Sequence, residues 1–241
     1  MDSMATEFRK LTPTTPPPDQ SERQAPSYEV EHDENRSRKL ACGLDPLDES
    51  PKDDLEWFNP EIQPTKEAQA QAEMLKGSVR QWVGGELTFL TIIGGTGVGK
   101  SELAKAAVWK LTPEWHDRHS YYITAAEFDK RVKDFDNAKN LAGAVSVDPD
   151  VWVERLAAAE YLVIDDIGAG YIDKGWTRGR LERLVDLRYR YKLPTIVISN
   201  LAPKNLTNEL GERTYSRLSD TDIAEVLILD KMADVRKITR A

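Results

Sequence analysis

The sequence predicts an α/β domain built as a three-layer sandwich, with a mostly parallel five-stranded sheet between two layers of helices. Short apolar runs rich in β-branched residues alternate along the chain with segments of helical periodicity, which is typical of a parallel sheet. The first of these runs leads directly into a glycine-rich loop and a helix. We expect the five strands within residues 87–93, 121–124, 161–164, 194–199 and 226–229.

Composition limits the classes of protein to which the chain can belong. Its 241 residues suffice for one core and a small extra segment. A net charge of -8 means that contact with nucleic acid would need a local basic patch. The single cysteine, Cys42, excludes an intramolecular disulfide and a zinc site made of several cysteines, and we expect a half-buried apolar residue there. No secretory signal and no apolar run near the roughly 20 residues that cross a bilayer are found, so we expect no contact with membranes and a cytoplasmic location.

The N-terminal part of the chain differs in composition from the rest. Residues 11–19 are rich in proline and threonine, and residues 27–39 are mostly charged. Such segments bury too little apolar surface to offset the entropy of ordering, so we expect residues 1–39 to form a disordered tail, or an arm that docks on a partner. A single folded domain then covers residues 40–241. It begins with a helical lead-in, to about residue 85, whose helix starts at Thr65 and ends at Gly84-Gly85.

Residues 94–101 match G-x-x-x-x-G-K-[ST], the loop that wraps the phosphates of a nucleoside triphosphate. A strand comes just before this loop and helix-forming residues 101–109 come just after it, which is the order that phosphate binding requires. Lys100 would reach the β- and γ-phosphates, and the hydroxyl of Ser101 would hold Mg²⁺. The alternative is a glycine-rich turn that happens to carry a lysine. The candidate phosphate-binding residues are Gly94, Gly95, Thr96, Gly97, Val98, Gly99, Lys100 and Ser101.

Two carboxylates end the apolar run at residues 161–164. A carboxylate at the C-terminal end of a neighbouring parallel strand lies beside the phosphate loop and can hold Mg²⁺, directly or through water. We assign Asp165 to the metal and Asp166 to the polarisation of the attacking water. The alternative is a pair of solvated carboxylates at the end of a strand.

Further polar residues follow later in the chain. Asn200 comes directly after the run at 194–199 and is expected to contact the γ-phosphate or the water, although asparagine also forms turns. Arg213 and Arg217 lie four residues apart, so they share one face of a helix. An arginine of this kind can stabilise charge at the γ-phosphate of a neighbouring subunit, or it can pair with surface acids. Arg236 could fold back on the nucleotide.

The nucleotide is expected to be ATP, because the chain contains no Asn-Lys-x-Asp segment of the kind that reads guanine. Two stretches, residues 178–180 and 188–192, combine arginine with tyrosine. They could contact the phosphates and bases of a single strand, or they could be solvated helix faces with packed tyrosines.

Taken together, these motifs resemble those of the DnaC-like helicase loaders, which are AAA+ ATPases close to the IstB transposition helpers and to phage or bacterial replication proteins. The resemblance rests on the phosphate loop and on the segments 163–168 (Val-Ile-Asp-Asp-Ile-Gly), 188–189, 193–201 (Leu-Pro-Thr-Ile-Val-Ile-Ser-Asn-Leu) and 211–218 (Gly-Glu-Arg-Thr-Tyr-Ser-Arg-Leu). The lead-in at residues 38–44 resembles the segment that enters the family's ATPase domain. The match runs from about residue 38 to the C-terminus.

The resemblance implies an AAA+ type P-loop NTPase fold and hydrolysis of ATP with Mg²⁺. It makes Lys100, Asp165, Asp166 and Asn200 catalytic, with Asn200 as the first nucleotide sensor. It assigns the intersubunit arginine finger to Arg217 with Arg213 as its companion, and the second sensor to Arg236. The implied partners are a hexameric replicative helicase, single-stranded DNA and further copies of the chain, assembled with ATP.

The sequence departs from the family in two respects. Asp166 stands where many AAA+ proteins have glutamate, which implies slow hydrolysis that assembly or DNA stimulates. The helicase-binding N-terminal domain of full-length loaders is not evident. Three other functions stay open: an IstB-like transposition helper that acts on duplex DNA, a small-molecule phosphotransferase with a lid at residues 168–180, and a module that binds nucleotide without hydrolysing it.

Overall fold

A computed structural model describes residues 28–47, 55–112, 120–139, 148–168 and 176–238 of the chain. The proline-rich part of the expected tail and most of the candidate lid lie outside these residues. The chain divides into two units, Met1–Asn35 and Arg36–Ala241. The sheet and the candidate site belong to the second unit, and the description below concerns that unit except where helix α2 crosses the boundary.

Five strands form one sheet in which every pairing is parallel, in the order β2-β3-β4-β1-β5. The strands are β1 (Phe89–Gly94), β2 (Ser120–Thr124), β3 (Tyr161–Ile167), β4 (Thr195–Ser199) and β5 (Ala224–Leu229). Each of the five predicted runs overlaps one of them. The predicted fold class, a parallel sheet between helical layers, is therefore confirmed.

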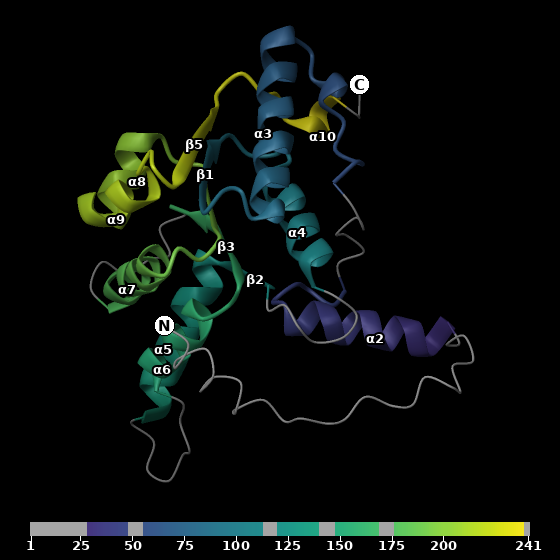
Figure 1. The fold of residues 1–241 in the computed structure, drawn as a ribbon. Coiled ribbons are helices and arrows are strands. Elements are labelled where there is room, and N and C mark those ends of the chain that lie inside the picture. Colours follow the sequence, from purple (N-terminus) through teal and green to yellow (C-terminus); the bar gives the residue numbers. More distant parts are fainter. Residues whose placement is uncertain (1–27, 48–54, 113–119, 140–147, 169–175, 239–241) are drawn as a thin grey trace. The chain divides into compact units, whose positions relative to one another are not determined.

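The helices follow the strands in the alternation that the sequence predicted (Figure 1). They are α2 (Tyr28–Ala41), η3 (Pro60–Ile62), α3 (Lys66–Gly84), α4 (Lys100–Leu111), α5 (Ala125–Lys139), α6 (Pro149–Ala157), α7 (Trp176–Arg190), α8 (Pro203–Leu210), α9 (Glu212–Leu218) and α10 (Val235–Ile238). None of the helices in the described segments is both long and apolar enough to cross a membrane.

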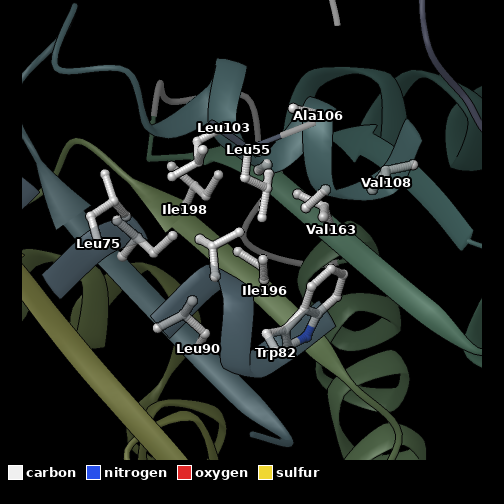
Figure 2. Close-up of a cluster of buried hydrophobic side chains, with 14 of the residues drawn as sticks. Leu55, Leu75, Trp82, Leu90, Leu103, Ala106, Val108, Val163, Ile196 and Ile198 are labelled. Atoms are coloured by element: carbon white, nitrogen blue, oxygen red, sulfur yellow. The ribbon is translucent and has the colours of Figure 1, made fainter. Parts of the chain in front are cut away.

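Each face of the sheet carries its own apolar core, because successive residues of a strand point to opposite faces. On one face, α3 and α4 pack over Leu90, Val163 and Ile196; Figure 2 shows this cluster, with Trp82 of α3 among the strand side chains. On the other face, α5, α6, α7, α8 and α9 cover alternate residues such as Phe89, Leu162 and Val197, as the layering in Figure 1 indicates. This double covering explains why the strands read as continuous apolar runs.

The ends of α3 agree with the prediction from capping residues. The Thr65 side chain accepts a hydrogen bond of 3.1 Å from the Ala68 backbone N–H, and Gly85 follows the helix in the left-handed conformation with φ of 78°. Glycine adopts this conformation without the steric cost of a Cβ atom, so the helix ends there.

Two local features differ from expectation. Helix α2 begins at Tyr28, so residues 28–39, which the sequence placed in the tail, are helical in the structure. Cys42 is 1% exposed, where a half-buried residue was expected, and burial raises the pKa of its thiol. A thiol of this kind is inert, so Cys42 acts as a small core residue.

Candidate nucleotide-binding site

The predicted phosphate loop joins the end of β1 to the start of α4. Helix α4 begins at Lys100, with Gly99 as its N-cap residue at φ of 92°. Gly97 also has a positive φ, 75°. Only glycine adopts these angles at little cost, and the turn they produce leads the chain into a helix N-terminus, where the backbone N–H groups and the helix dipole favour an anion. The local geometry is therefore that of a phosphate-binding loop.

Lys100 is 5% exposed and its ammonium group contacts three oxygens. It donates hydrogen bonds to the backbone oxygens of Gly94 at 2.9 Å and Gly95 at 2.6 Å, and to Oδ1 of Asn200 at 3.0 Å. Burial lowers the pKa of Lys100, while the nearby carboxylates of Asp165 and Asp166 act in the opposite direction. A bound phosphate would replace the loop carbonyls as partners of this ammonium.

Asn200 joins the lysine to one of the two carboxylates. Its Oδ1 accepts the bond from Lys100, and its Nδ2 donates a hydrogen bond of 3.0 Å to Oδ1 of Asp166. This orientation of the amide is fixed by its partners, because a carboxylate only accepts and an ammonium only donates. Three predicted site residues, at the start of α4 and at the ends of β4 and β3, thus lie in one hydrogen-bonded row.

The strand order corrects one detail of the prediction. The strand with the two carboxylates, β3, is not the neighbour of β1; β4 lies between them. Asn200, at the end of β4, consequently occupies the position between the phosphate loop and the carboxylates. The carboxyl ends of parallel strands remain the place where the polar groups meet.

A β-bulge at the end of β3 sets the directions of Asp165 and Asp166. Between the pairs Ile164↔Val197 and Ile167↔Ser199, β3 advances by three residues while β4 advances by two. Asp166 accordingly has φ of 57°, an uncommon angle for a residue other than glycine. The hydroxyl of Ser199 donates a hydrogen bond of 2.6 Å to the Ile167 backbone oxygen and so holds the chain after the bulge. Bulges of this kind redirect side chains next to functional sites.

The two carboxylates have different surroundings. Asp165 is 3% exposed; its Oδ1 accepts the Asp166 backbone N–H at 2.6 Å, and its Oδ2 accepts the Tyr122 hydroxyl at 2.5 Å. Asp166 is half-buried and contacts Asn200. Ser101, the second residue of α4, is half-buried as well. A carboxylate and a hydroxyl fit Mg²⁺, which binds few protein oxygens and keeps waters and substrate phosphates as its other ligands.

Arg236 lies beside Gly97 of the glycine loop. A Cβ atom built on Gly97 would come within 2.6 Å of Nη2 of Arg236 and within 2.0 Å of Oδ1 of Asp234. The backbone N–H of Val235 donates a hydrogen bond of 2.9 Å to the Gly97 oxygen. This approach of the C-terminal segment is possible only because residue 97 has no side chain.

Sequence reasoning missed three residues of this region. They are Tyr122, which contacts Asp165; Asp234, which pairs with Arg236; and Phe58, whose ring would lie 2.8 Å from a Cβ atom on Gly99. A further feature is Gln63, which exchanges two hydrogen bonds with the backbone of Ala233 and thereby fixes the segment that carries Asp234. The sequence offered little indication of these roles. A tyrosine in a strand, such as Tyr122, is an ordinary core residue, and a glutamine before a helix, such as Gln63, is an ordinary surface residue.

The two candidate trans-acting arginines lie on α9 and, in the described segments, contact α7 and not the phosphate loop. Arg217 forms an ion pair with Asp186, and its guanidinium carbon lies 5.7 Å from the centre of the Tyr189 ring. The Arg217 side chain is only 16% exposed. The Arg213 side chain is 70% exposed, and its nitrogens are no closer than 3.9 Å to Asp186 and 4.0 Å to Glu182.

Part of the basic surface proposed for single strands is internal. Arg188 is fully buried and donates hydrogen bonds to Thr195 and to four backbone oxygens. Arg180 is 9% exposed and pairs with Asp150 at 3.0 Å. These two arginines therefore hold α7 against its neighbours. The end of the second stretch, residues 190–192, remains exposed.

Comparison with known proteins supports the fold. No family model matches the sequence, and no curated protein does. Among solved structures, the DnaC helicase loader has a TM-score of 0.52 and 21% identity, and the match covers 72% of this chain and 97% of that one. The replication initiator DnaA bound to AMPPCP and single-stranded DNA has a TM-score of 0.56 and 18% identity, over 74% of this chain and 50% of that one.

The chain shares its fold with these replication proteins. Domain III of the replication initiation protein DnaA from Thermotoga maritima has a similar structure, with a TM-score of 0.53 and 22% identity over 79% of this chain and 73% of that one. At these identities the likeness concerns the fold, so the resemblance read from the motifs is confirmed at that level. The chain spans about half the length of the DnaA protein bound to AMPPCP and single-stranded DNA.

Proposed function

We propose that the protein is an ATPase that binds ATP and Mg²⁺ at the phosphate loop and hydrolyses ATP slowly. The observation that carries this proposal is the row Lys100–Asn200–Asp166, in which contacts of 3.0 Å join the first residue of α4 to the ends of β4 and β3. A hydrogen-bonded row of this kind supports the proposal, because it offers a cation for a phosphate and an amide and a carboxylate for an attacking water within one site.

Each residue then has a role that follows from its position. The loop N–H groups and Lys100 bind the phosphates and stabilise the charge that develops on the γ-phosphate in the transition state. Ser101 and Asp165 would hold Mg²⁺, which supplies further neutralisation of phosphate charge. Asp166 orients the water and accepts its proton, and Asn200 keeps Asp166 and Lys100 at a fixed separation.

We further propose that the protein acts in DNA replication by loading a hexameric replicative helicase onto single-stranded DNA. The combination of the family motifs with the DnaC-like fold supports this role, as do the nucleotide and single strand bound by the similar DnaA structure. Arg190, Tyr191 and Lys192 are exposed and supply charge and one aromatic ring for contact with a strand. ATP-dependent assembly of several copies would bring the α9 arginines to a neighbouring site.

The test is ATP binding and hydrolysis by the full chain, with and without single-stranded DNA, compared among the wild type, Lys100→Ala and Lys110→Ala. Lys110 is an exposed lysine in the last turn of the same helix, so it controls for loss of charge on α4. We expect slow turnover that single strands stimulate, at least a ~100-fold loss in Lys100→Ala and no change in Lys110→Ala.

Hydrolysis that survives in Lys100→Ala would contradict the ATPase proposal. If single-stranded DNA does not change the rate of ATP hydrolysis, the loading role is contradicted and the ATPase proposal stands. If duplex DNA stimulates hydrolysis more than single strands do, the result favours a transposition helper in place of a helicase loader. Binding to single strands should weaken steeply as salt rises, because each lysine or arginine contact with a phosphate releases counterions. A small metabolite that accelerates turnover would favour the phosphotransferase.

A further inference from the structure

A buried tyrosine on an edge strand contacts the carboxylate assigned to the metal. Tyr122 of β2 is 6% exposed, and its hydroxyl donates a hydrogen bond of 2.5 Å to Oδ2 of Asp165. Burial and the negative charge of Asp165 raise the pKa of Tyr122, so the hydroxyl keeps its proton and acts as the donor. With the Asp166 N–H on Oδ1, each oxygen of Asp165 has one donor from the protein.

Two donors leave the carboxylate with free lone pairs but with little freedom to rotate. A carboxylate can accept about four hydrogen bonds or ligands, so Asp165 retains capacity for Mg²⁺ or for a water on Mg²⁺. The plane of its carboxyl group is set by the two donors. Of these, the Asp166 N–H is part of the bulge itself, whereas Tyr122 is supplied from another strand.

The lead-in segment contacts Tyr122 along the edge of β2 that no other strand pairs with in the described segments. β2 is an edge strand that pairs with β3 alone among the strands. On its other side, the Tyr122 N–H donates a hydrogen bond of 2.8 Å to the backbone oxygen of Cys42. A Cβ atom on Gly43 would lie 2.1 Å from the backbone oxygen of Tyr122, and Gly43 has φ of 77°. The close approach of these two backbones therefore requires glycine at position 43.

The ring of Tyr122 is held as firmly as its backbone. It belongs to the same apolar cluster as Cys42 and Leu44 of the lead-in, Val98 of the phosphate loop and Leu103 of α4. A side chain buried in a close-packed core has little rotamer freedom, so the core restricts the position of the hydroxyl.

We propose that Tyr122 is a positioning residue for Asp165: its hydroxyl sets the orientation of the carboxylate toward Ser101 and Mg²⁺, and the lead-in at Cys42 and Gly43 fixes Tyr122. The inference rests on the proposed ATPase function. Partners that orient the ligands of a metal typically change metal affinity or activity by about 10- to 100-fold when they are removed. A tyrosine that only fills the core would have no such effect once its ring is kept.

The test is Tyr122→Phe, which removes one oxygen atom and keeps the ring. Tyr121→Phe is the matched control, because Tyr121 is the preceding residue of the same strand and belongs to the core cluster on the opposite face of the sheet. The affinity for a fluorescent ATP analogue is measured over a range of Mg²⁺ concentrations and also in EDTA. We expect Tyr122→Phe to need about 10-fold more Mg²⁺ for half of the metal-dependent gain in affinity, with unchanged binding in EDTA.

A second variant, Gly43→Ala, perturbs Tyr122 through the backbone. The added methyl group must push the lead-in away from the backbone oxygen of Tyr122. We therefore expect this variant, too, to need more Mg²⁺ for half of the metal-dependent gain in affinity. Wild-type dependence on Mg²⁺ in Tyr122→Phe would overturn the inference and leave the ATPase proposal intact. Loss of binding in EDTA would also overturn it, because the hydroxyl would then support the whole site. Failure of the wild type to bind nucleotide would overturn the proposed function itself.

Discussion

The carboxylate of Asp234 and the guanidinium of Arg236 form an ion pair through two contacts, directly against Gly97 of the phosphate loop. Nε of Arg236 lies 3.0 Å from Oδ1 of Asp234, and Nη2 lies 3.1 Å from Oδ2. The hydrogen bond between them lowers the pKa of Asp234 and raises that of Arg236, so both groups are charged over the physiological range. The negative charge of Asp234 thus lies next to the place where phosphates are proposed to bind. It also pairs with Arg236, the arginine that would contact those phosphates.

The first prediction follows from this ion pair. Asp234→Asn removes a negative charge beside the loop and releases Arg236 toward the phosphates. We expect tighter nucleotide binding, by about three- to fivefold at low salt, which is the effect of one partly screened charge. Titration of a fluorescent nucleotide at two ionic strengths measures this effect, and Asp222→Asn, an exposed aspartate before β5, is the control for net charge.

The double variant Asp234→Asn with Arg236→Gln separates the two causes. If the gain comes from release of the arginine, most of it disappears in the Arg236→Gln background. If it persists, removal of the negative charge alone explains it. Weaker binding by Asp234→Asn would show that the ion pair shapes the loop for phosphate, contrary to the prediction.

The second prediction concerns the amide between the lysine and the carboxylate. Asn200→Ala leaves Lys100 and Asp166 in place but removes the group that sets their separation. We expect hydrolysis to fall by about 100-fold, because Lys100 and Asp166 are no longer aligned for the transition state, while the affinity for ATP changes little. Single-turnover hydrolysis and nucleotide titration together measure these two quantities.

Asn205→Ala on α8 is the control, because Asn205 is exposed and lies at the start of the next helix. A loss of affinity with an unchanged single-turnover rate in Asn200→Ala would mean that the amide binds the ground state and the transition state alike. That outcome would remove Asn200 from the catalytic residues.

The third prediction concerns Arg188, which connects α7 with the end of α6 and the start of β4. It donates to the backbone oxygens of Ala157, Ala159, Glu160 and Pro194, at distances from 2.6 to 3.4 Å. Burial lowers its pKa to about 9, so the group is still protonated at pH 7 and all its N–H groups are donors. Arg188→Met keeps much of the volume but leaves these oxygens without partners.

We expect Arg188→Met to lower the free energy of unfolding by about 3 kcal/mol, since buried acceptors are left unsatisfied. Urea denaturation measures this change. Arg190→Met, two residues later, is the control; the Arg190 side chain is 63% exposed and pairs with Asp186, so its loss should cost under about 1 kcal/mol. Equal effects of the two variants would contradict the structural role of Arg188.

Arg188 also shows where sequence reasoning failed. The segment Arg-Tyr-Arg-Tyr-Lys was read as a basic surface because of its composition. The buried residues of α7 include Leu181, Leu184, Val185 and Arg188, which are spaced by three and four residues along one helical stripe. Periodicity therefore placed Arg188 on the inner face, and it was a better guide than charge.

The phosphate loop and the carboxylates were predictable because each is encoded in a short stretch of chain. Strand, glycines, lysine and helix follow one another within residues 87–111, and local pattern is enough to recognise them. The contacts between segments were not predictable in this way. The position of β4 between β1 and β3, and hence the contact of Asn200 with Lys100, depends on strand order, which no local pattern specifies. The bond from Tyr122 to Asp165 likewise depends on the pairing of β2 with β3.

The fourth prediction decides which arginine acts on a neighbouring subunit. The resemblance assigns this role to Arg217, whose side chain is paired with Asp186 and whose Nη1 is buried without a hydrogen-bond partner in the described segments. Arg213, on the same face of α9, extends into solvent with no contact closer than 3.9 Å to an acid. In this structure Arg213 can reach another chain by giving up only two long ion pairs, of 3.9 and 4.0 Å, so we expect Arg213→Ala to lose most hydrolysis while its thermal stability is unchanged.

Mixing two inactive variants tests whether the arginine acts in trans. Lys100→Ala has a defective phosphate loop but intact arginines, whereas Arg213→Ala has an intact loop. If the arginine completes the site of a neighbour, a mixture of the two restores part of the hydrolysis that neither has alone, and the restored activity rises with protein concentration because it depends on assembly. We expect Arg217→Ala instead to lower thermal stability, because it removes the half-buried ion pair with Asp186 and the contact with the Tyr189 ring. Restoration by Arg217→Ala and not by Arg213→Ala would reverse the assignment and require the ion pair with Asp186 to open during assembly.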